Sequence, residues 1–91
     1  MATRAVLSVL GKDRTGIVAT VATTLTEASA NIDDIRQDIL DGIFSMTMMV
    51  TLDEDACPFG ELQAKLAEDA EKLHLQITLQ REDVFHFMYE V

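Results

Sequence analysis

The sequence predicts an α+β domain, a ferredoxin-like βαββαβ sandwich with a four-stranded antiparallel sheet and two helices on one face. Three observations lead to this fold. Alternating apolar residues mark four strands, and apolar residues at four-residue intervals mark two helices between them. An Asp-Gly turn also joins the two middle strands. The 91 residues are enough for one modest core, so we expect a single domain over residues 1–91.

The first half of the chain predicts a strand, a helix and a second strand. Residues Thr3–Leu10 are apolar and β-branched, as in a strand with at least one buried face. Four-residue spacing of apolar side chains predicts a helix over about Arg14–Ala28, with Asp13 as its N-cap. The second strand covers Asn31–Leu40, and its alternation slips by one residue near Asp33-Asp34, as a β-bulge would cause.

The second half begins with the hairpin turn Asp41-Gly42, whose residue types favour the type I′ conformation. The returning strand is expected over Ile43–Leu52. An amphipathic helix over Phe59–Leu73 and an alternating strand over His74–Arg81 follow. Helical spacing then predicts a short third helix over Glu82–Val91.

The predicted sheet leaves one face without helices, and that face has mixed polarity. It would carry Asp34, Arg36 and Asp38 together with the apolar side chains of Val6, Leu10, Ile43 and Met49. These apolar residues are too many to leave in water together. We therefore expect a partner on this face or on an edge of the sheet, and a second copy of the chain is the simplest partner.

Composition excludes several classes of function. Lys and Arg total 7 against 16 Asp and Glu, which gives a net charge of −9. Phosphate backbones and anionic lipid surfaces are bound by basic residues, so we expect neither nucleic acid nor membrane as a partner. The single cysteine, Cys57, allows no internal disulfide, and no apolar run is long enough to span a bilayer. We expect a cytoplasmic protein.

The loop between the first strand and the first helix is the most informative segment. Gly11 ends the strand, and Gly16 allows a close approach to the first turn of the helix. The free N–H groups at a helix start attract a carboxylate or a phosphate. The alternative is that both glycines serve only the geometry of the turn, since their spacing matches neither a P-loop nor a dinucleotide fingerprint.

The string Gly-Lys-Asp-Arg-Thr-Gly-Ile-Val at Gly11–Val18, followed by Asn-Ile-Asp-Asp-Ile at Asn31–Ile35, resembles the start of an ACT domain. The likeness covers essentially the whole chain. The tail, with Asp83–Phe85 and Met88-Tyr89, resembles the stand-alone ACT proteins of the UPF0237 group. More distantly, it resembles the ACT regions of the glycine cleavage system transcriptional repressor.

This resemblance implies a regulatory module that binds an amino acid or a related small anion and relays its presence to a larger protein. ACT domains typically pair, so it implies a homodimer with the effector at the subunit interface, between the first loop and the start of the second strand. The ligand-binding positions would be Gly11, Lys12, Asp13, Arg14, Gly16 and Asn31. The Asp13 carboxylate suits an α-ammonium group, and the helix N-terminus suits an α-carboxylate.

Two other functions remain open at this point. One is an interaction subunit that binds a larger partner without any ligand. The other is an acylphosphatase-like hydrolase, for which Arg14 and Asn31 supply the residue types but Asp13 would repel the phosphoryl group. No nucleophile–base grouping or metal-ligand spacing accompanies His74 and His86, so we expect no enzyme, no cofactor and no metal site.

Overall fold

The computed structural model describes residues 2–12 and 16–82. Their elements follow the order β1 (Ala2–Gly11), α1 (Ile17–Glu27), β2 (Asn31–Leu40), β3 (Ile43–Asp53), α2 (Phe59–Leu73) and β4 (Gln76–Arg81). This order confirms the predicted βαββαβ arrangement. The predicted third helix falls outside the described residues from residue 83 onward.

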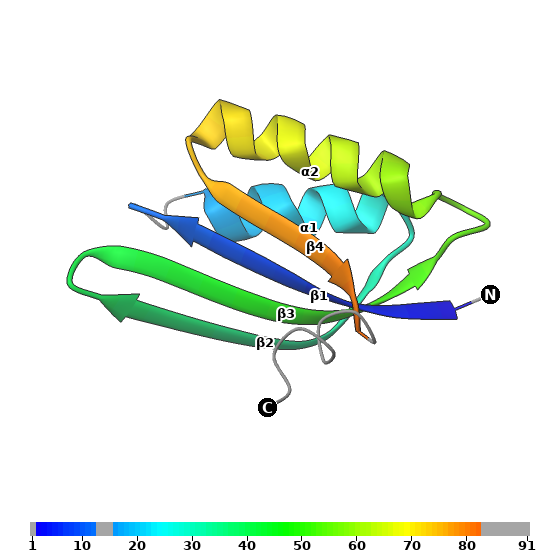
Figure 1. Ribbon diagram of the computed structural model, residues 1–91, viewed down its shortest axis with the longest axis horizontal. Helices are drawn as coiled ribbons and strands as arrows, with labels where there is room; N and C mark the ends of the chain where they lie inside the picture. Colours follow the sequence, from blue (N-terminus) through cyan, green and yellow to red (C-terminus); the bar gives the residue numbers. More distant parts are fainter. Residues whose placement is uncertain (1, 13–15, 83–91) are drawn as a thin grey trace.

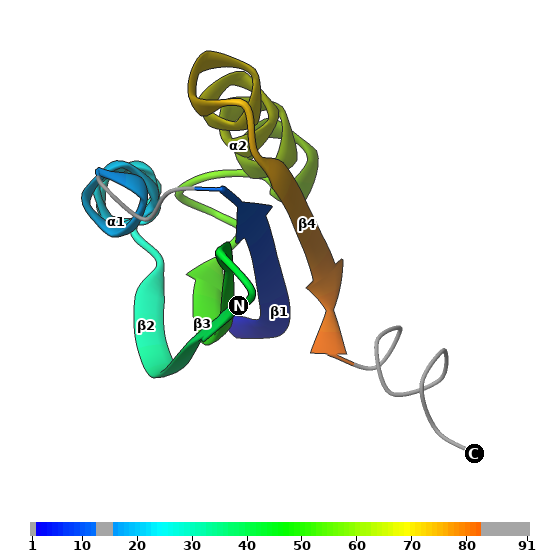
Figure 2. The same ribbon diagram turned by 90° about the vertical axis from the view of Figure 1, so that its left-hand side faces the viewer.

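The four strands form one antiparallel sheet in the order β2-β3-β1-β4. Both helices lie on the same side of this sheet, with α1 towards β2 and α2 towards β4 (Figures 1 and 2). The β1 strand pairs with both β3 and β4, so it lies inside the sheet. Among the described strands, β2 has a neighbour only on its β3 side and forms one edge of the sheet.

The hairpin between β2 and β3 has the predicted turn. Asp41 and Gly42 both have positive φ, at 52° and 81°, as a type I′ turn requires. Leu40 and Ile43 close the ladder on either side of the turn. The predicted bulge is also present, since the register shifts between Ile32 and Asp34 and leaves Asp33 as the extra residue of β2.

The core lies between the helices and the sheet. From the sheet it takes Ala5, Leu7, Val9, Phe44, Met46, Met48, Val50, Leu52 and Leu79, and from the helices Ile17, Val21, Leu25, Leu62 and Leu66. Met46 and Met48 are fully buried here, as expected for adaptable packing side chains. A hydrogen bond from the Thr24 hydroxyl to the buried Asp69 carboxylate links the two helices.

Two predicted boundaries are wrong. The first helix begins at Ile17 rather than Arg14, because Gly16 has a left-handed φ of 76° and is itself the N-cap in place of Asp13. The last strand begins at Gln76 rather than His74. His74 has a φ of 56° and ends α2, and the N–H of Leu75 still donates to the Ala70 carbonyl of that helix.

The helix-free face differs in part from the expectation. Leu10 and Ile43 are 45% and 51% exposed, as predicted, whereas Val6 is buried. The sequence did not predict that apolar side chains on the helix side of β2 are also exposed. Ile35 and Ile39 pair with the core residues Met48 and Phe44, but every residue of β2 is exposed. The edge position of β2 in the sheet explains this exposure.

Candidate functional site

The loop that the sequence singled out starts at one end of the sheet. Gly11 pairs with Phe44 of β3, close to the hairpin turn. At the other end of the loop, Gly16 precedes α1 with a positive φ, which favours glycine over other residues. Its carbonyl accepts the N–H of Thr20 at 3.0 Å, and the first turn of α1 contains no acidic side chain. The start of α1 is therefore free of negative charge among the described residues.

A cavity of about 690 Å³ opens beside this loop. It is lined by Leu10, Gly11, Lys12, Ile17, Ile43, Leu73, His74, Leu75 and Gln76. Most of these side chains are apolar, while Lys12, His74 and Gln76 supply polar groups. This combination of an apolar lining with a few polar groups is typical of small-molecule sites. Two of the predicted ligand residues, Gly11 and Lys12, border this cavity.

Gly11 is required at its position by packing. A Cβ there would lie closer than 3.0 Å to Leu75 Cδ2 and 3.3 Å from Ile17 Cδ1. The missing side chain therefore lets Leu75, the residue before β4, and the start of α1 pack against the end of β1 beside the cavity. The sequence identified the glycine, but nothing in the sequence pointed to Leu75 as its neighbour.

Asn31 does not join this cavity within one protomer. Asn31 pairs with Thr51 of β3, whereas Gly11 pairs with Phe44 of the same strand. These two positions of β3 are seven residues apart, which corresponds to about 23 Å along the strand. The Asn31 amide donates to Asp33 Oδ1 at 2.6 Å instead. Hydrogen bonds from Thr51 and then Asn31 hold the pKa of Asp33 below its usual value. Asp13 and Arg14, the other predicted charged ligands, lie outside the described residues.

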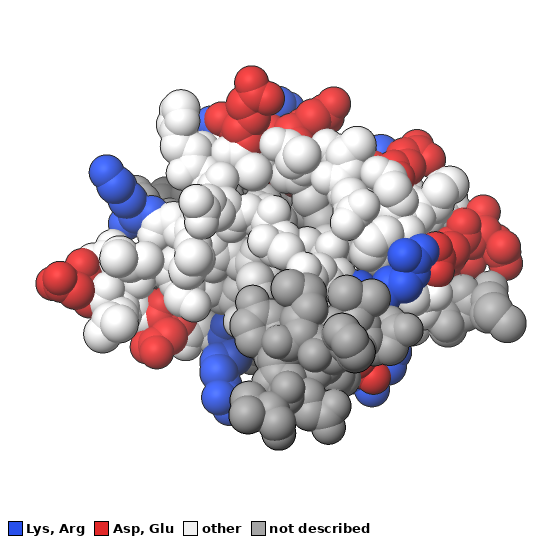
Figure 3. All heavy atoms as spheres, viewed as in Figure 1, with Lys and Arg blue, Asp and Glu red and all other residues white. Residues whose placement is uncertain are grey.

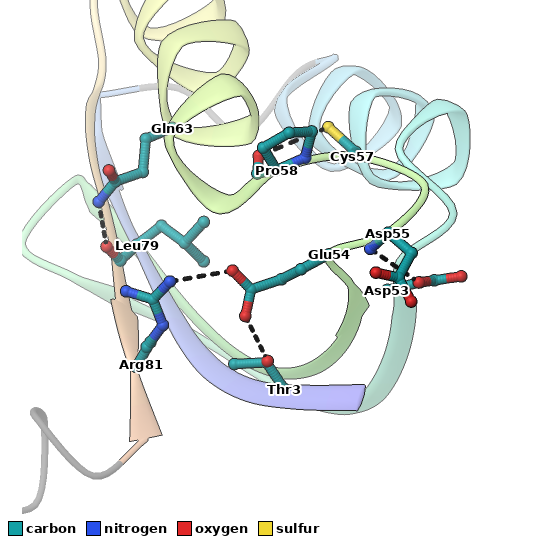
Figure 4. Close-up of polar contacts among 9 residues, drawn as sticks. All are labelled: Thr3, Asp53, Glu54, Asp55, Cys57, Pro58, Gln63, Leu79 and Arg81. Carbon is teal, nitrogen blue, oxygen red and sulfur yellow. Dashed lines mark hydrogen bonds and ion pairs between the residues drawn. The ribbon is translucent and has the colours of Figure 1, made fainter. Parts of the chain in front are cut away.

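A second polar cluster lies at the end of the sheet opposite Gly11 (Figure 4). Glu54 accepts hydrogen bonds from the Thr3 hydroxyl at 2.5 Å and from Arg81 at 2.9 Å. These bonds, with Thr3 the larger influence, lower the pKa of Glu54. Arg81 also stacks on the Phe59 ring, 4.1 Å from its centroid. The cluster joins β1, β4 and the start of α2, and no pattern in the sequence signalled it.

Two further kinds of site were sought among the described residues, a metal centre and a membrane span. Within residues 2–12 and 16–82, no three His, Cys, Asp or Glu side chains are grouped so that they could hold a metal ion. No helix in those same ranges is long and apolar enough to cross a membrane. On the face seen in Figure 3, the charged side chains of the described residues lie mainly at the periphery.

Comparisons with known proteins agree with the fold and with the resemblance seen in the sequence. Residues 3–80 match the family model of the ACT domain. A UPF0237 protein of Listeria monocytogenes is 44% identical over 88 residues, which cover 97% of this chain and 99% of the relative. A UPF0237 protein of Methanocaldococcus jannaschii is 42% identical, and the match covers 97% of this chain and 98% of that relative.

Solved structures give the same result. An ACT domain protein from Streptococcus pneumoniae is 37% identical and superposes with a TM-score of 0.82, covering 98% of this chain and all of that one (100%). A putative glycine cleavage system transcriptional repressor has a TM-score of 0.79, with 89% of this chain and 46% of that chain covered. Its identity of 22% supports a shared fold alone.

Proposed function

The chain belongs to the ACT domain family, and from this premise we propose that it is a homodimeric regulatory module for an amino acid or a related small anion. ACT domains are small-molecule-binding regulatory modules. The observation that supports a ligand site at a particular place is the cavity of about 690 Å³ bordered by Gly11 and Lys12. The family resemblance and the cavity point to the same loop.

The lining of the cavity suits an amino acid with an apolar side chain. Leu10, Ile17 and Leu75 offer apolar contact, and the Lys12 ammonium offers a partner for a carboxylate. The free N–H groups at the start of α1 add a second attraction for negative charge. We include Gly16 in the proposed site for this reason, together with Asp13 and Arg14 from the resemblance.

A second copy of the chain would complete the site. The β2 strand runs from the Thr51 end of the sheet towards the Gly11 end, and all its residues are exposed. An antiparallel β2 strand of a partner would run the opposite way, so its Asn31 would lie at the Gly11 end. We therefore propose that the loop of one protomer and the partner's Asn31 share the ligand, and that the occupied dimer acts on a larger protein.

The test is calorimetric titration of the folded protein with each of the twenty amino acids, accompanied by thermal shift. We expect at least one amino acid to bind, and we expect Lys12→Glu to weaken it by about tenfold or more. Lys65→Glu is the matched control, because it makes the same charge reversal on α2 outside the cavity. If the folded protein shows neither heat nor thermal stabilisation with any amino acid, the amino-acid proposal is wrong.

A regulatory module of this kind needs no catalytic group. In the hydrolase alternative, the Asp13 carboxylate would repel the phosphoryl group of the substrate whether Asn31 comes from the same protomer or from its partner. We expect benzoyl phosphate to remain unhydrolysed by the protein, and measurable turnover would contradict a purely regulatory role.

A further inference from the structure

The turn from α2 to β4 holds a histidine beside the cavity in a backbone conformation that favours glycine. His74 ends α2 with φ 56° and ψ 51°, in the left-handed region. Its N–H and that of Leu75 both donate to the Ala70 carbonyl, and helices that end in this way most often carry glycine at this residue. A Cβ is strained there, so His74 lowers the stability of the fold. A binding role for its side chain would account for a strained residue at this place.

Strand pairing brings Lys12 to the same place. The ladder between β1 and β4 ends with Leu10 opposite Gln76. Continuing this register by two residues sets Lys12 opposite His74. In Figure 1, the turn from α2 to β4 lies at the same end of the sheet as the tip of β1. Lys12 and His74 are both exposed and both line the cavity, so two side chains that can carry positive charge lie together at its open side.

We propose that His74 binds the carboxylate of the ligand together with Lys12, and that it does so as an imidazolium, so that binding strengthens as the pH falls. The carboxylate of the amino acid then lies at the turn between α2 and β4. Its apolar side chain lies deeper in the cavity, among Leu10, Ile17 and Leu75. This inference rests on the proposed function and adds to it one binding residue and regulation by pH.

The charges around the cavity agree with a carboxylate at this position. Among the described residues that line it from β1, α1, β3 and β4, Lys12 is charged and none is acidic. A carboxylate beside an imidazole favours the charged form of the ring, which gains and loses its proton between about pH 5 and pH 8. The lining therefore favours an anion although the chain has a net charge of −9. Other charged side chains of the surrounding elements are Asp41 in the hairpin turn, Glu71 and Lys72 near the end of α2, and Asp13 and Arg14, which lie outside the described residues.

Replacement of His74 by glycine separates a binding role from a structural one. His74→Gly relieves the left-handed conformation, so we expect the folding equilibrium constant to rise by roughly twofold to fivefold in urea unfolding. The same variant should bind L-leucine roughly tenfold more weakly in calorimetric titration, because one of the two groups that hold the carboxylate is gone. Ser29→Gly is the matched control, since Ser29 has a φ of 60° just after α1 and is not among the residues that line the cavity. It should stabilise the fold to a similar degree and leave the binding of L-leucine unchanged.

The charge of the imidazole is tested by pH and by the choice of ligand. Between about pH 6 and pH 8, the affinity of the unmodified protein for L-leucine should fall by roughly tenfold, since the ring loses its proton over this range. His74→Lys keeps a positive charge throughout, so its affinity for L-leucine should change by less than roughly twofold. His86 is still present in that variant and serves as an internal control. L-leucinamide, which lacks the carboxylate, should lose less affinity than L-leucine when His74 is replaced by glycine.

The possible outcomes separate this inference from the proposed function. A His74→Gly variant that is more stable but binds L-leucine more weakly supports the inference, as does pH-independent binding by His74→Lys. Unchanged binding by His74→Gly, a joint loss of stability and binding, or a pH dependence that persists in His74→Lys overturns it. If a polar amino acid binds and L-leucine does not, this inference falls while amino-acid binding stands. If none of the twenty amino acids binds the folded protein, both fall.

Discussion

Replacing Gly11 by alanine adds one methyl group where β1 ends at the cavity. The new Cβ would lie closer than 3.0 Å to Leu75 Cδ2 and 3.3 Å from Ile17 Cδ1. Ile17 is fully buried and cannot retreat, whereas Leu75 is half-buried and borders the cavity. Overpacking of a core costs about 1–3 kcal/mol. Because Leu75 has open space to move into, we expect the lower end, about 1 kcal/mol.

Urea unfolding at a fixed protomer concentration measures this effect. A loss of about 1 kcal/mol corresponds to a fall in Tm of about 4–8 °C for a domain of this size. Displacement of Leu75 into the cavity should also weaken the bound amino acid. The double variant Gly11→Ala/Leu75→Ala should cost less than the sum of its parts, because the truncated side chain no longer opposes the methyl group.

Gly60→Ala is the matched control for the Gly11 variant. A Cβ at Gly60 would meet nothing within 4 Å, and the residue lies in the first turn of α2. Alanine there should stabilise the protein by about 0.5–1 kcal/mol through helix propensity. The two variants thus make the same chemical change with opposite expected signs. A Gly11 variant as stable as the unmodified protein would refute the packing argument.

Three further predictions concern stability and are checked by urea unfolding. Thr24→Val removes the hydroxyl that donates to buried Asp69, which should lower the unfolding free energy by about 1–3 kcal/mol; an unchanged value would contradict a stabilising bond. Gly42→Ala places alanine at a φ of 81° and should cost about 1 kcal/mol, so tolerance without loss would contradict the type I′ turn. The pKa values of Glu54 and Asp33 are lowered on folding, so the unfolded chain binds more protons and stability rises with pH there. The contribution of these two carboxylates to stability is complete at pH values above their ordinary pKa values of 4.5 and 3.8, and it disappears as the pH falls through the lowered pKa values of the folded state. An unfolding free energy that does not change with pH in this acidic range would contradict the prediction.

The fold was predictable because its signals are local. The type I′ turn needs positive φ at two adjacent residues, and Asp41-Gly42 supplies residues that accept it. The slip in alternation near Asp33 likewise predicted the bulge. The sequence placed the start of β4 at His74 instead of Gln76 because the alternation of apolar and polar residues in β4 already begins at His74 and Leu75. The alternation of residue types cannot show that His74 has a left-handed backbone conformation and ends α2 rather than beginning a strand.

The candidate site was predictable only in part. The loop glycines and Lys12 were visible in the sequence, and Gly11 and Lys12 border the cavity. The other wall of the cavity comes from Leu73 to Leu75, where α2 joins β4, and only the folded chain brings it beside the loop. The distance of Asn31 from the loop follows from how β2 pairs with β3 and how β3 pairs with β1. No single sequence motif shows both of these pairings.

The most direct test of a site shared between two protomers is amino-acid binding by mixed dimers. Protomers carrying Lys12→Glu are combined with protomers carrying Asn31→Ala, and the amino acid that binds the unmodified protein is titrated into the mixture. If the partner's Asn31 completes each site, one site of every mixed dimer keeps both groups, and binding lost in each variant alone returns at the unmodified affinity. Mixed dimers that form but bind no more than either variant alone would contradict a shared site.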